Sequence, residues 1–152
     1  MQVICIKTGL EKSLLPLYFE VNHHHHTFLE SPNHQLSLVE IDKLKSDTLL
    51  LKLQKQYPTL TLENNISRPE EIDIVINASP SGMNKNDLLP IDPYTFRSGI
   101  MIADSITKPN FTPFLKSAKS NGCFIQKGNE MADAQLQIFL DFLGTPPENS
   151  HV

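Results

Sequence analysis

The sequence predicts a three-layer α/β domain with a mostly parallel sheet. From residue 36 onward, short apolar segments alternate with longer segments of helical periodicity, a pattern typical of parallel α/β folds. The run IDIVINA (72–78) is apolar at successive positions, as expected for a strand that helices cover on both faces. The 152 residues suffice for one domain with a core and are too few for two full domains.

The predicted elements follow in regular order. We expect strands at 35–42, 59–63, 72–78, 99–105 and 123–127. A helix over 46–57 has Ser46 as its N-cap and stops at Pro58, and a second helix over 112–122 is closed by Gly122. The last helix spans 129–144, where one face carries Met131, Ala134, Gln135, Ile138 and Phe142.

The two ends of the chain differ from this pattern. Residues 1–7 could form a strand, but residues 1–35 as a whole show no clear period and stay unassigned. The domain is expected over 36–144 and a flexible tail over 145–152. The run His23 to His26 could bind a divalent metal, but no carboxylate or cysteine follows at ligand spacing, so a solvated loop is favoured.

Composition excludes several classes of function. A net charge of −4 and the lack of a basic stripe with interleaved aromatics argue against nucleic-acid binding. Cys5 and Cys123 lack CxxC spacing, and no segment reaches the roughly 20 apolar residues of a membrane span. These features predict a cytoplasmic protein with reduced thiols.

Candidate ligand contacts lie after the predicted strands, because parallel sheets bind ligands at the carboxyl ends of their strands. Asp42 could accept hydrogen bonds from the ribose hydroxyls of NAD, or it could be a helix cap. In NASPSGM (77–83), Ser79 and Ser81 offer hydroxyls, although an ordinary turn has the same composition. In KGNEMADAQ (127–135), Gly128 could expose backbone amides, while Met131 and Gln135 individually fit a structural role equally well.

Taken together, three ordered motifs resemble the C-terminal nucleotide-binding domain of the shikimate dehydrogenase family, including its quinate dehydrogenase-like members. DIVINASPSGM (73–83) resembles the family pattern D-x-x-x-N-A-T-P-x-G-M, with Ser79 in place of threonine. IADSITKPNFTPFLKSAKSNGC (102–123) resembles the next strand, its K-P turn and helix. KGNEMADAQLQIFLDFLG (127–144) resembles the closing G-x-x-M-x-x-x-Q helix.

This resemblance implies a Rossmann-like fold and a set of contacts with NAD or NADP. It implies that Ala78, Ser79 and Ser81 line the cofactor, that Ile106 and Gly128 approach the nicotinamide, that Met131 packs on this ring, and that Gln135 hydrogen-bonds a substrate hydroxyl. Asp42 and Lys43 fall where NADP-using members place Asn-Arg. The aspartate favours NAD, while the lysine keeps NADP open. Thr107 replaces a tyrosine found in many members.

Two expected parts of the family pattern are missing. Residues 1–35 contain only Gly9, so the glycine-rich phosphate loop is absent and the fold is expected to be incomplete at its N-terminal end. The catalytic lysine and aspartate of the family lie in a preceding domain for which this chain has no room. The expectation is a shortened relative that is weak or inactive alone in interconverting 3-dehydroshikimate and shikimate, unless a partner chain supplies the missing domain. The alternative is a noncatalytic nucleotide-binding or subunit-interaction domain.

Overall fold

The computed structural model describes residues 2–7 and 34–143. Its six strands are β1 (Gln2–Lys7), β2 (Gln35–Glu40), β3 (Thr61–Asn64), β4 (Ile74–Asn77), β5 (Met101–Asp104) and β6 (Phe124–Gln126). Its α-helices are α3 (Lys43–Gln56), α4 (Pro113–Ser120) and α5 (Gly128–Phe142), with short 3-10 turns at Pro69–Glu71 and Pro93–Thr95. The α/β class predicted from the alternating pattern is confirmed.

The strands form one mixed sheet in the order β3-β2-β1-β4-β5-β6. Three neighbouring pairs are parallel, namely β2 with β3, β4 with β5, and β5 with β6. Strand β1 lies in the middle and runs antiparallel to both β2 and β4. The predicted strand at residues 1–7 therefore exists, and it occupies the central position of the sheet with its direction reversed.

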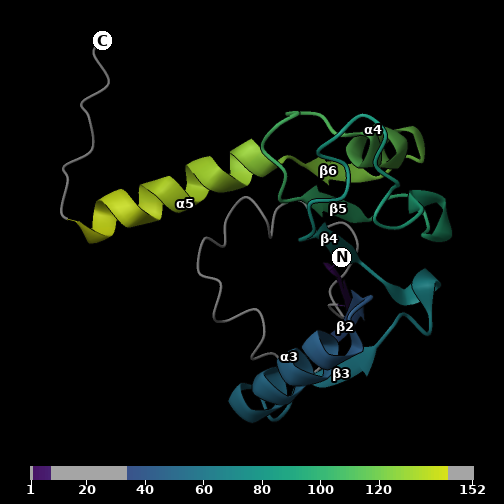
Figure 1. Ribbon diagram of the computed structural model, residues 1–152, viewed down its shortest axis with the longest axis vertical. Helices are drawn as coiled ribbons and strands as arrows, with labels where there is room; N and C mark the ends of the chain where they lie inside the picture. Colours follow the sequence, from purple (N-terminus) through teal and green to yellow (C-terminus); the bar gives the residue numbers. More distant parts are fainter. Residues whose placement is uncertain (1, 8–33, 144–152) are drawn as a thin grey trace.

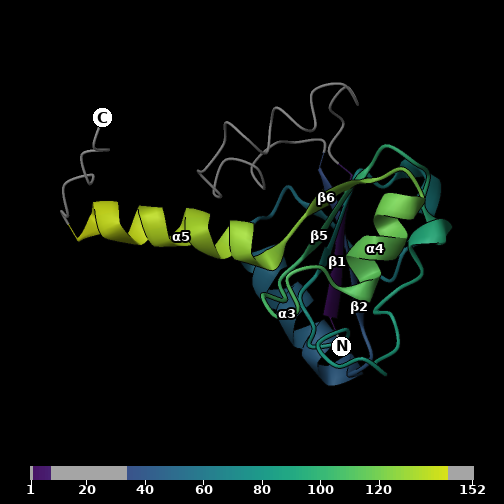
Figure 2. The ribbon, with the colours of Figure 1, turned by 90° about the horizontal axis from the view of Figure 1, so that it is seen from above.

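The central strand is apolar on both sides, which suits its position. Val3 and Cys5 join the core cluster beneath α4, whereas Ile4 packs against the cluster beneath α3 and Ile6 lies in a further cluster with Ile74. Alternate residues of a strand point to opposite faces, so β1 contributes to both sides of the sheet. Figures 1 and 2 show α3 and α4 on opposite faces, which gives the expected three layers.

Helix α3 begins three residues before the predicted start. Asp42 is its N-cap and accepts a hydrogen bond from the Lys45 N–H at 3.2 Å. The prediction of Ser46 as N-cap is wrong: Ser46 is buried inside the helix and donates its hydroxyl to Asn64 Oδ1 at 3.0 Å. The predicted first strand also ends earlier, at Glu40, because Asp42 already belongs to the helix start.

The helices α4 and α5 match their predicted segments but differ in their surroundings. Helix α4 buries Phe114, Leu115 and Ala118 against the sheet. Helix α5 instead points away from the sheet in both views, and Phe142 near its end is 85% exposed. Helical periodicity thus identified both helices, but it did not reveal that α5 leaves the body of the domain.

Replacing Arg97 by alanine should lower the free energy of unfolding by about 2 kcal/mol. Arg97 Nη2 lies 2.5 Å from Asp73 Oδ1, and its Nε donates to the Glu70 carbonyl at 3.2 Å. The Asp73 side chain is nearly buried, so losing its cation leaves a poorly solvated charge. Urea denaturation followed by circular dichroism measures the effect.

The control is Arg68→Ala, which removes a more exposed ion pair with Glu71 and should change the free energy of unfolding by no more than about 0.5 kcal/mol. Equal losses in both variants would contradict the prediction.

Candidate functional site

The predicted site residues lie along one edge of the sheet. Asn77 and Asp104 are direct partners across β4 and β5, and Ala103 pairs with Gln126 on β6. Strands β2 and β4 both run antiparallel to β1, so the carboxyl end of β2 lies at this edge as well. The loops that follow β2, β4, β5 and β6 therefore meet at one edge of the sheet, as the parallel pattern predicted.

The loop after β4 is built around the buried amide of Asn77. Asn77 Oδ1 accepts hydrogen bonds from the Ser79 hydroxyl at 2.7 Å and the Ser79 N–H at 3.0 Å. Its Nδ2 donates to the Ser81 carbonyl at 3.2 Å and to Asp104 Oδ1 at 3.0 Å. All four bonding positions of this side chain are used, so Asn77 fixes the shape of residues 77–81 and joins them to β5.

The two serines of this loop are engaged by backbone groups or by Asn77. Ser79 is buried, and its hydroxyl also accepts from the Ser81 N–H at 3.2 Å. The Ser81 hydroxyl donates to the Leu88 carbonyl at 2.5 Å. Ala78 is exposed beside them. The hydroxyls thus hold the loop in place in this structure, and the exposed side chains of residues 77–83 are those of Ala78, Pro80 and Met83.

Asp104 is the buried carboxyl of the site. Its Oδ1 also accepts from the Ile106 N–H at 3.1 Å, and its Oδ2 accepts from the Thr112 hydroxyl at 2.6 Å. Burial raises the pKa of Asp104, while the bonds from Thr112, Ile106 and Asn77 act in the opposite direction. Thr112 in turn accepts from the Leu115 N–H at 3.2 Å and caps α4. The carboxyl therefore ties the loops after β4 and β5 to the start of α4.

Gly128 and Ile106 come into backbone contact. A Cβ atom added to Gly128 would lie 2.4 Å from the Ile106 carbonyl oxygen and 2.8 Å from the Ser105 carbonyl carbon. On the other side, a Cβ at Gly82 would lie 3.7 Å from Ile106 Cδ1. Ile106 therefore sits between the loop after β4 and the start of α5, and only glycine at position 128 permits this approach.

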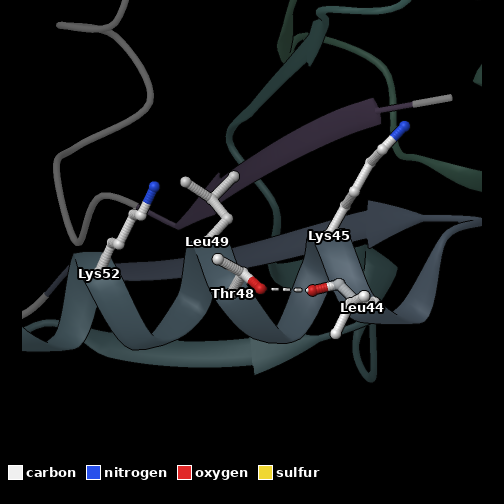
Figure 3. A pocket seen from close by; sticks show the side chains of 5 residues that line it. All are labelled: Leu44, Lys45, Thr48, Leu49 and Lys52. Atoms are coloured by element: carbon white, nitrogen blue, oxygen red, sulfur yellow. Dashed lines mark hydrogen bonds between the residues drawn. The ribbon is translucent and has the colours of Figure 1, made fainter.

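The acidic residue after β2 is already engaged. Asp42 caps α3, and its Oδ2 lies 3.6 Å from Lys45 Nζ. The Lys45 N–H is the main cause of a lowered pKa at Asp42. Lys43 is exposed next to it. Helix α3 also carries a surface hollow of about 320 Å³ (Figure 3), lined by Leu44, Lys45, Thr48, Leu49 and Lys52. The Thr48 hydroxyl there donates to the Leu44 carbonyl at 2.7 Å.

The predicted contacts on α5 are spread along the helix. Met131 is partly buried near the helix start, whereas Gln135 is exposed one turn later. Glu130 accepts from the Lys127 N–H at 3.0 Å and the Lys127 ammonium at 2.8 Å, which closes this helix start. The structure thus brings Ile106, Gly128 and the 77–82 loop together, with Met131 one turn into the adjoining helix, while Asp42 and Lys43 lie beyond β1.

Sequence reasoning missed four residues of this edge. Asn77, Asp104 and Thr112 form its buried hydrogen-bond network, and Asn129 Oδ1 is the one buried side-chain oxygen or nitrogen without a partner in the described parts of the chain. A polar residue that directly ends an apolar strand, such as Asn77 or Asp104, could have been recognised as a buried hydrogen-bonding group. Nothing local connects Thr112 with Asp104, since the contact depends on the turn between them.

The structure also describes the features that bear on membrane spans, metal binding and the two cysteines. Within residues 2–7 and 34–143, no helix is long and apolar enough to cross a membrane. The same residues contain no group of three or more His, Cys, Asp or Glu side chains placed to hold a metal. The run His23 to His26 lies outside them. Cys5 and Cys123 are both free and buried, and burial raises the pKa of the Cys5 thiol to about 12.

Comparison with known proteins points to one group of enzymes. No family model matches the chain. Over 92 residues it is 34% identical to a shikimate dehydrogenase (NADP(+)) of Prochlorococcus marinus (strain MIT 9515), an alignment that covers 54% of this chain and 32% of the relative. A similar match, 33% identical over 72 residues, covers 47% of this chain and 27% of a shikimate dehydrogenase (NADP(+)) of Staphylococcus haemolyticus (strain JCSC1435). The chain thus spans about a third of the length of these relatives.

Solved structures agree with this result. The ligand-free 5-ketofructose reductase of Gluconobacter sp. strain CHM43 superposes with a TM-score of 0.63 at 27% identity, over 71% of this chain and 41% of that one. A shikimate dehydrogenase in complex with NADP+ superposes with a TM-score of 0.59 at 25% identity, over 69% of this chain and 39% of that one. The chain therefore resembles part of a shikimate dehydrogenase, and its Rossmann-like fold is confirmed.

Proposed function

We propose that the sheet edge described above binds the nicotinamide end of NAD or NADP, within an oxidoreductase domain of the shikimate dehydrogenase type spanning residues 36–144. The observation that carries this proposal is the meeting of Gly82, Ile106 and Gly128. These residues belong to three chain segments that are more than 20 residues apart in the sequence. They meet at one point, where the Gly128 backbone lies closer to the Ile106 backbone than a residue with a Cβ atom would allow. A flat ring needs such a surface of backbone and small residues.

The residues of this edge have distinct roles in the proposal. Ala78 and Ser81 line the nicotinamide ribose, and Ser79 acts through the shape of the loop because its hydroxyl is held by Asn77. Ile106 and Gly128 form the surface beneath the ring, and Met131 packs beside it. Gln135, exposed on α5, would reach a substrate hydroxyl. The bound nicotinamide supplies the chemistry of hydride transfer, while these side chains bind and orient it.

The preference between the two cofactors is expected to be small. Asp42 would accept bonds from a ribose, which favours NAD, but its carboxylate already caps α3 and pairs with Lys45. Lys43 is exposed beside it and suits a 2′-phosphate. The related enzyme solved with NADP+ also supports a nicotinamide cofactor for this chain.

The proposed substrate pair is shikimate and 3-dehydroshikimate, from the similarity to shikimate dehydrogenases. Turnover by this chain alone should be weak or nil. Hydride removal from an alcohol requires simultaneous removal of the hydroxyl proton, and an absent acid/base pair lowers the rate by about two to four orders of magnitude. None of the residues assigned above at the strand ends supplies such a pair. Full activity would then depend on a partner chain that supplies it.

A second candidate function is favoured by helix α5. Leu136, Phe142 and Leu143 are 56%, 85% and 61% exposed on this projecting helix. Apolar side chains gathered on an exposed helix are typical of an interaction surface. The chain could therefore serve as a noncatalytic subunit that binds a partner through α5.

The test is a titration of the purified chain with NADH and with NADPH. The chain has no tryptophan, so the emission of the reduced nicotinamide can be followed without interference. Saturable binding below millimolar concentrations is expected for the natural sequence, and no binding is expected for Gly128→Ala. Gly99→Ala, at the opposite edge of the sheet, is the control and should bind as the natural sequence does. Lack of binding by the natural chain would remove the nicotinamide role and leave the subunit function as the better interpretation. Rapid oxidation of shikimate with NAD+ or NADP+ would contradict the expected need for a partner.

A further inference from the structure

Strand β1 runs in the wrong direction for a phosphate loop. Val3 is paired with Asn77, and Ile6 with Ile74, so β1 starts at the edge that carries the site and ends at the opposite edge. The ion pair between Lys7 and Glu71, 2.5 Å apart, lies at that opposite edge just before β4. The chain leaves β1 there and re-enters the sheet at the same edge, because Lys7 pairs with Gln35 at the start of β2.

This direction removes the usual place for a pyrophosphate. In dinucleotide-binding sheets, the turn after the central strand and the helix N-terminus that follows it hold the two phosphates with backbone N–H groups. Such a turn must lie at the carboxyl edge of the parallel strands. Here the central strand places its first residues at that edge, and its last residue, Lys7, lies on the far side of the sheet from Asn77 and Asp104.

None of the helix starts that the structure describes offers another binding site for the pyrophosphate. The N-terminus of α3 is capped by Asp42, that of α4 by Thr112, and that of α5 is closed by Glu130. Asp42 accepts the Lys45 N–H, and Thr112 accepts the Leu115 N–H. Glu130 accepts the Lys127 N–H and places a carboxylate at the start of α5, where it would repel a phosphate. Glu40 adds a carboxylate opposite Gln2, and a hydrogen bond from the Asp42 N–H lowers its pKa, which keeps the group charged. Glu40 and Asp42 thus balance the charges of Lys43 and Lys45, so this part of the edge offers a pyrophosphate no net positive charge.

We infer that this chain recognises only the nicotinamide mononucleotide half of its cofactor, and that the pyrophosphate and adenosine of NAD or NADP add almost no affinity. The inference rests on the nicotinamide binding proposed above. The loops after β4, β5 and β6 form the site, and the β2 end with Asp42 and Lys43 lies across the reversed strand from it. Residues 2–7 and 34–143 contain no phosphate site that would connect the two.

The experiment compares reduced nicotinamide mononucleotide with NADH and NADPH on the full chain, using the nicotinamide emission for all three. Their dissociation constants should agree within about threefold, whereas two or more charge-assisted phosphate contacts would separate them by about a hundredfold. AMP at tenfold excess should not displace NADH.

The possible outcomes distinguish failure of the mononucleotide inference from failure of the nicotinamide-binding proposal. Binding of NADH more than about tenfold tighter than the mononucleotide would overturn the inference and keep the nicotinamide proposal. Displacement of NADH by AMP would also overturn it, because the adenosine half would then be bound. If none of the three compounds binds, the nicotinamide proposal fails and the inference falls with it.

Discussion

Replacing Thr112 by valine is expected to lower the free energy of unfolding by about 3 kcal/mol at neutral pH. The Thr112 side chain is fully buried, donates to Asp104 Oδ2 at 2.6 Å and accepts from the Leu115 N–H at 3.2 Å. Valine keeps the shape but removes both hydrogen bonds. One of them stabilises a buried carboxylate, and the other caps α4, so both losses contribute.

The effect of this substitution should depend on pH. Burial raises the pKa of Asp104, and the hydrogen bond from Thr112 is the foremost effect that opposes this rise. A carboxyl with a raised pKa in the folded state contributes stability that is fully present below the unfolded value of about 3.9 and is lost as the pH rises through the folded value. Valine raises this pKa further, so the ionised carboxylate is less well tolerated. The gap between the natural chain and Thr112→Val should therefore be larger at pH 7 than at pH 4.

Urea denaturation at the two pH values measures this gap. Thr112→Ser is the matched control, because serine keeps the hydroxyl and loses one methyl group, and its loss should be about 1 kcal/mol with little pH dependence. If valine and serine were equally stable, or if the gap did not narrow on acidification, the role given to the Thr112 hydroxyl would be wrong.

Replacing Gly128 by alanine is expected to cost about 3 kcal/mol of stability and to abolish nicotinamide binding. The new Cβ would lie 2.4 Å from the Ile106 carbonyl oxygen and 2.6 Å from the Ile106 carbonyl carbon. Both are backbone atoms, so no side-chain rotation can relieve the overlap. The loop after β5 and the start of α5 must move apart, and the surface assigned to the nicotinamide ring opens.

Gly99→Ala supplies the matched control. Gly99 has a φ of +76°, so alanine there is strained by about 1 kcal/mol, but its Cβ would meet no atom within 4 Å. Gly99 also lies before β5, at the edge of the sheet opposite the site. Chemical denaturation and a nicotinamide titration of both variants separate backbone strain from loop displacement. If Gly128→Ala behaved like Gly99→Ala in both measurements, the close approach of Gly128 to Ile106 would not matter.

Much of the arrangement of the strand-end loops could be predicted from the sequence. The apolar runs before Asn77 and Asp104 placed both residues at the ends of strands, and the alternation of strand and helix brought those ends to one edge. The motifs around Ser79 and Gly128 could be recognised because their spacing along the chain is fixed by local turns. The N-cap of α3 was misplaced by four residues because aspartate and serine are both good caps, and only the packing of Ser46 against Asn64 distinguishes them.

The sequence by itself determined the α/β class, the order of its elements and the edge at which a ligand site should lie, because these follow from local periodicity and turn residues. The tertiary structure alone decided three other features: the reversed direction of β1, the contact between Thr112 and Asp104, and the approach of Gly128 to Ile106. The apolar run in QVICIK suits a buried strand of either direction, so only its pairing with β2 and β4 can fix the direction. Contacts between distant segments likewise leave no trace in the local pattern, since they depend on how the elements pack.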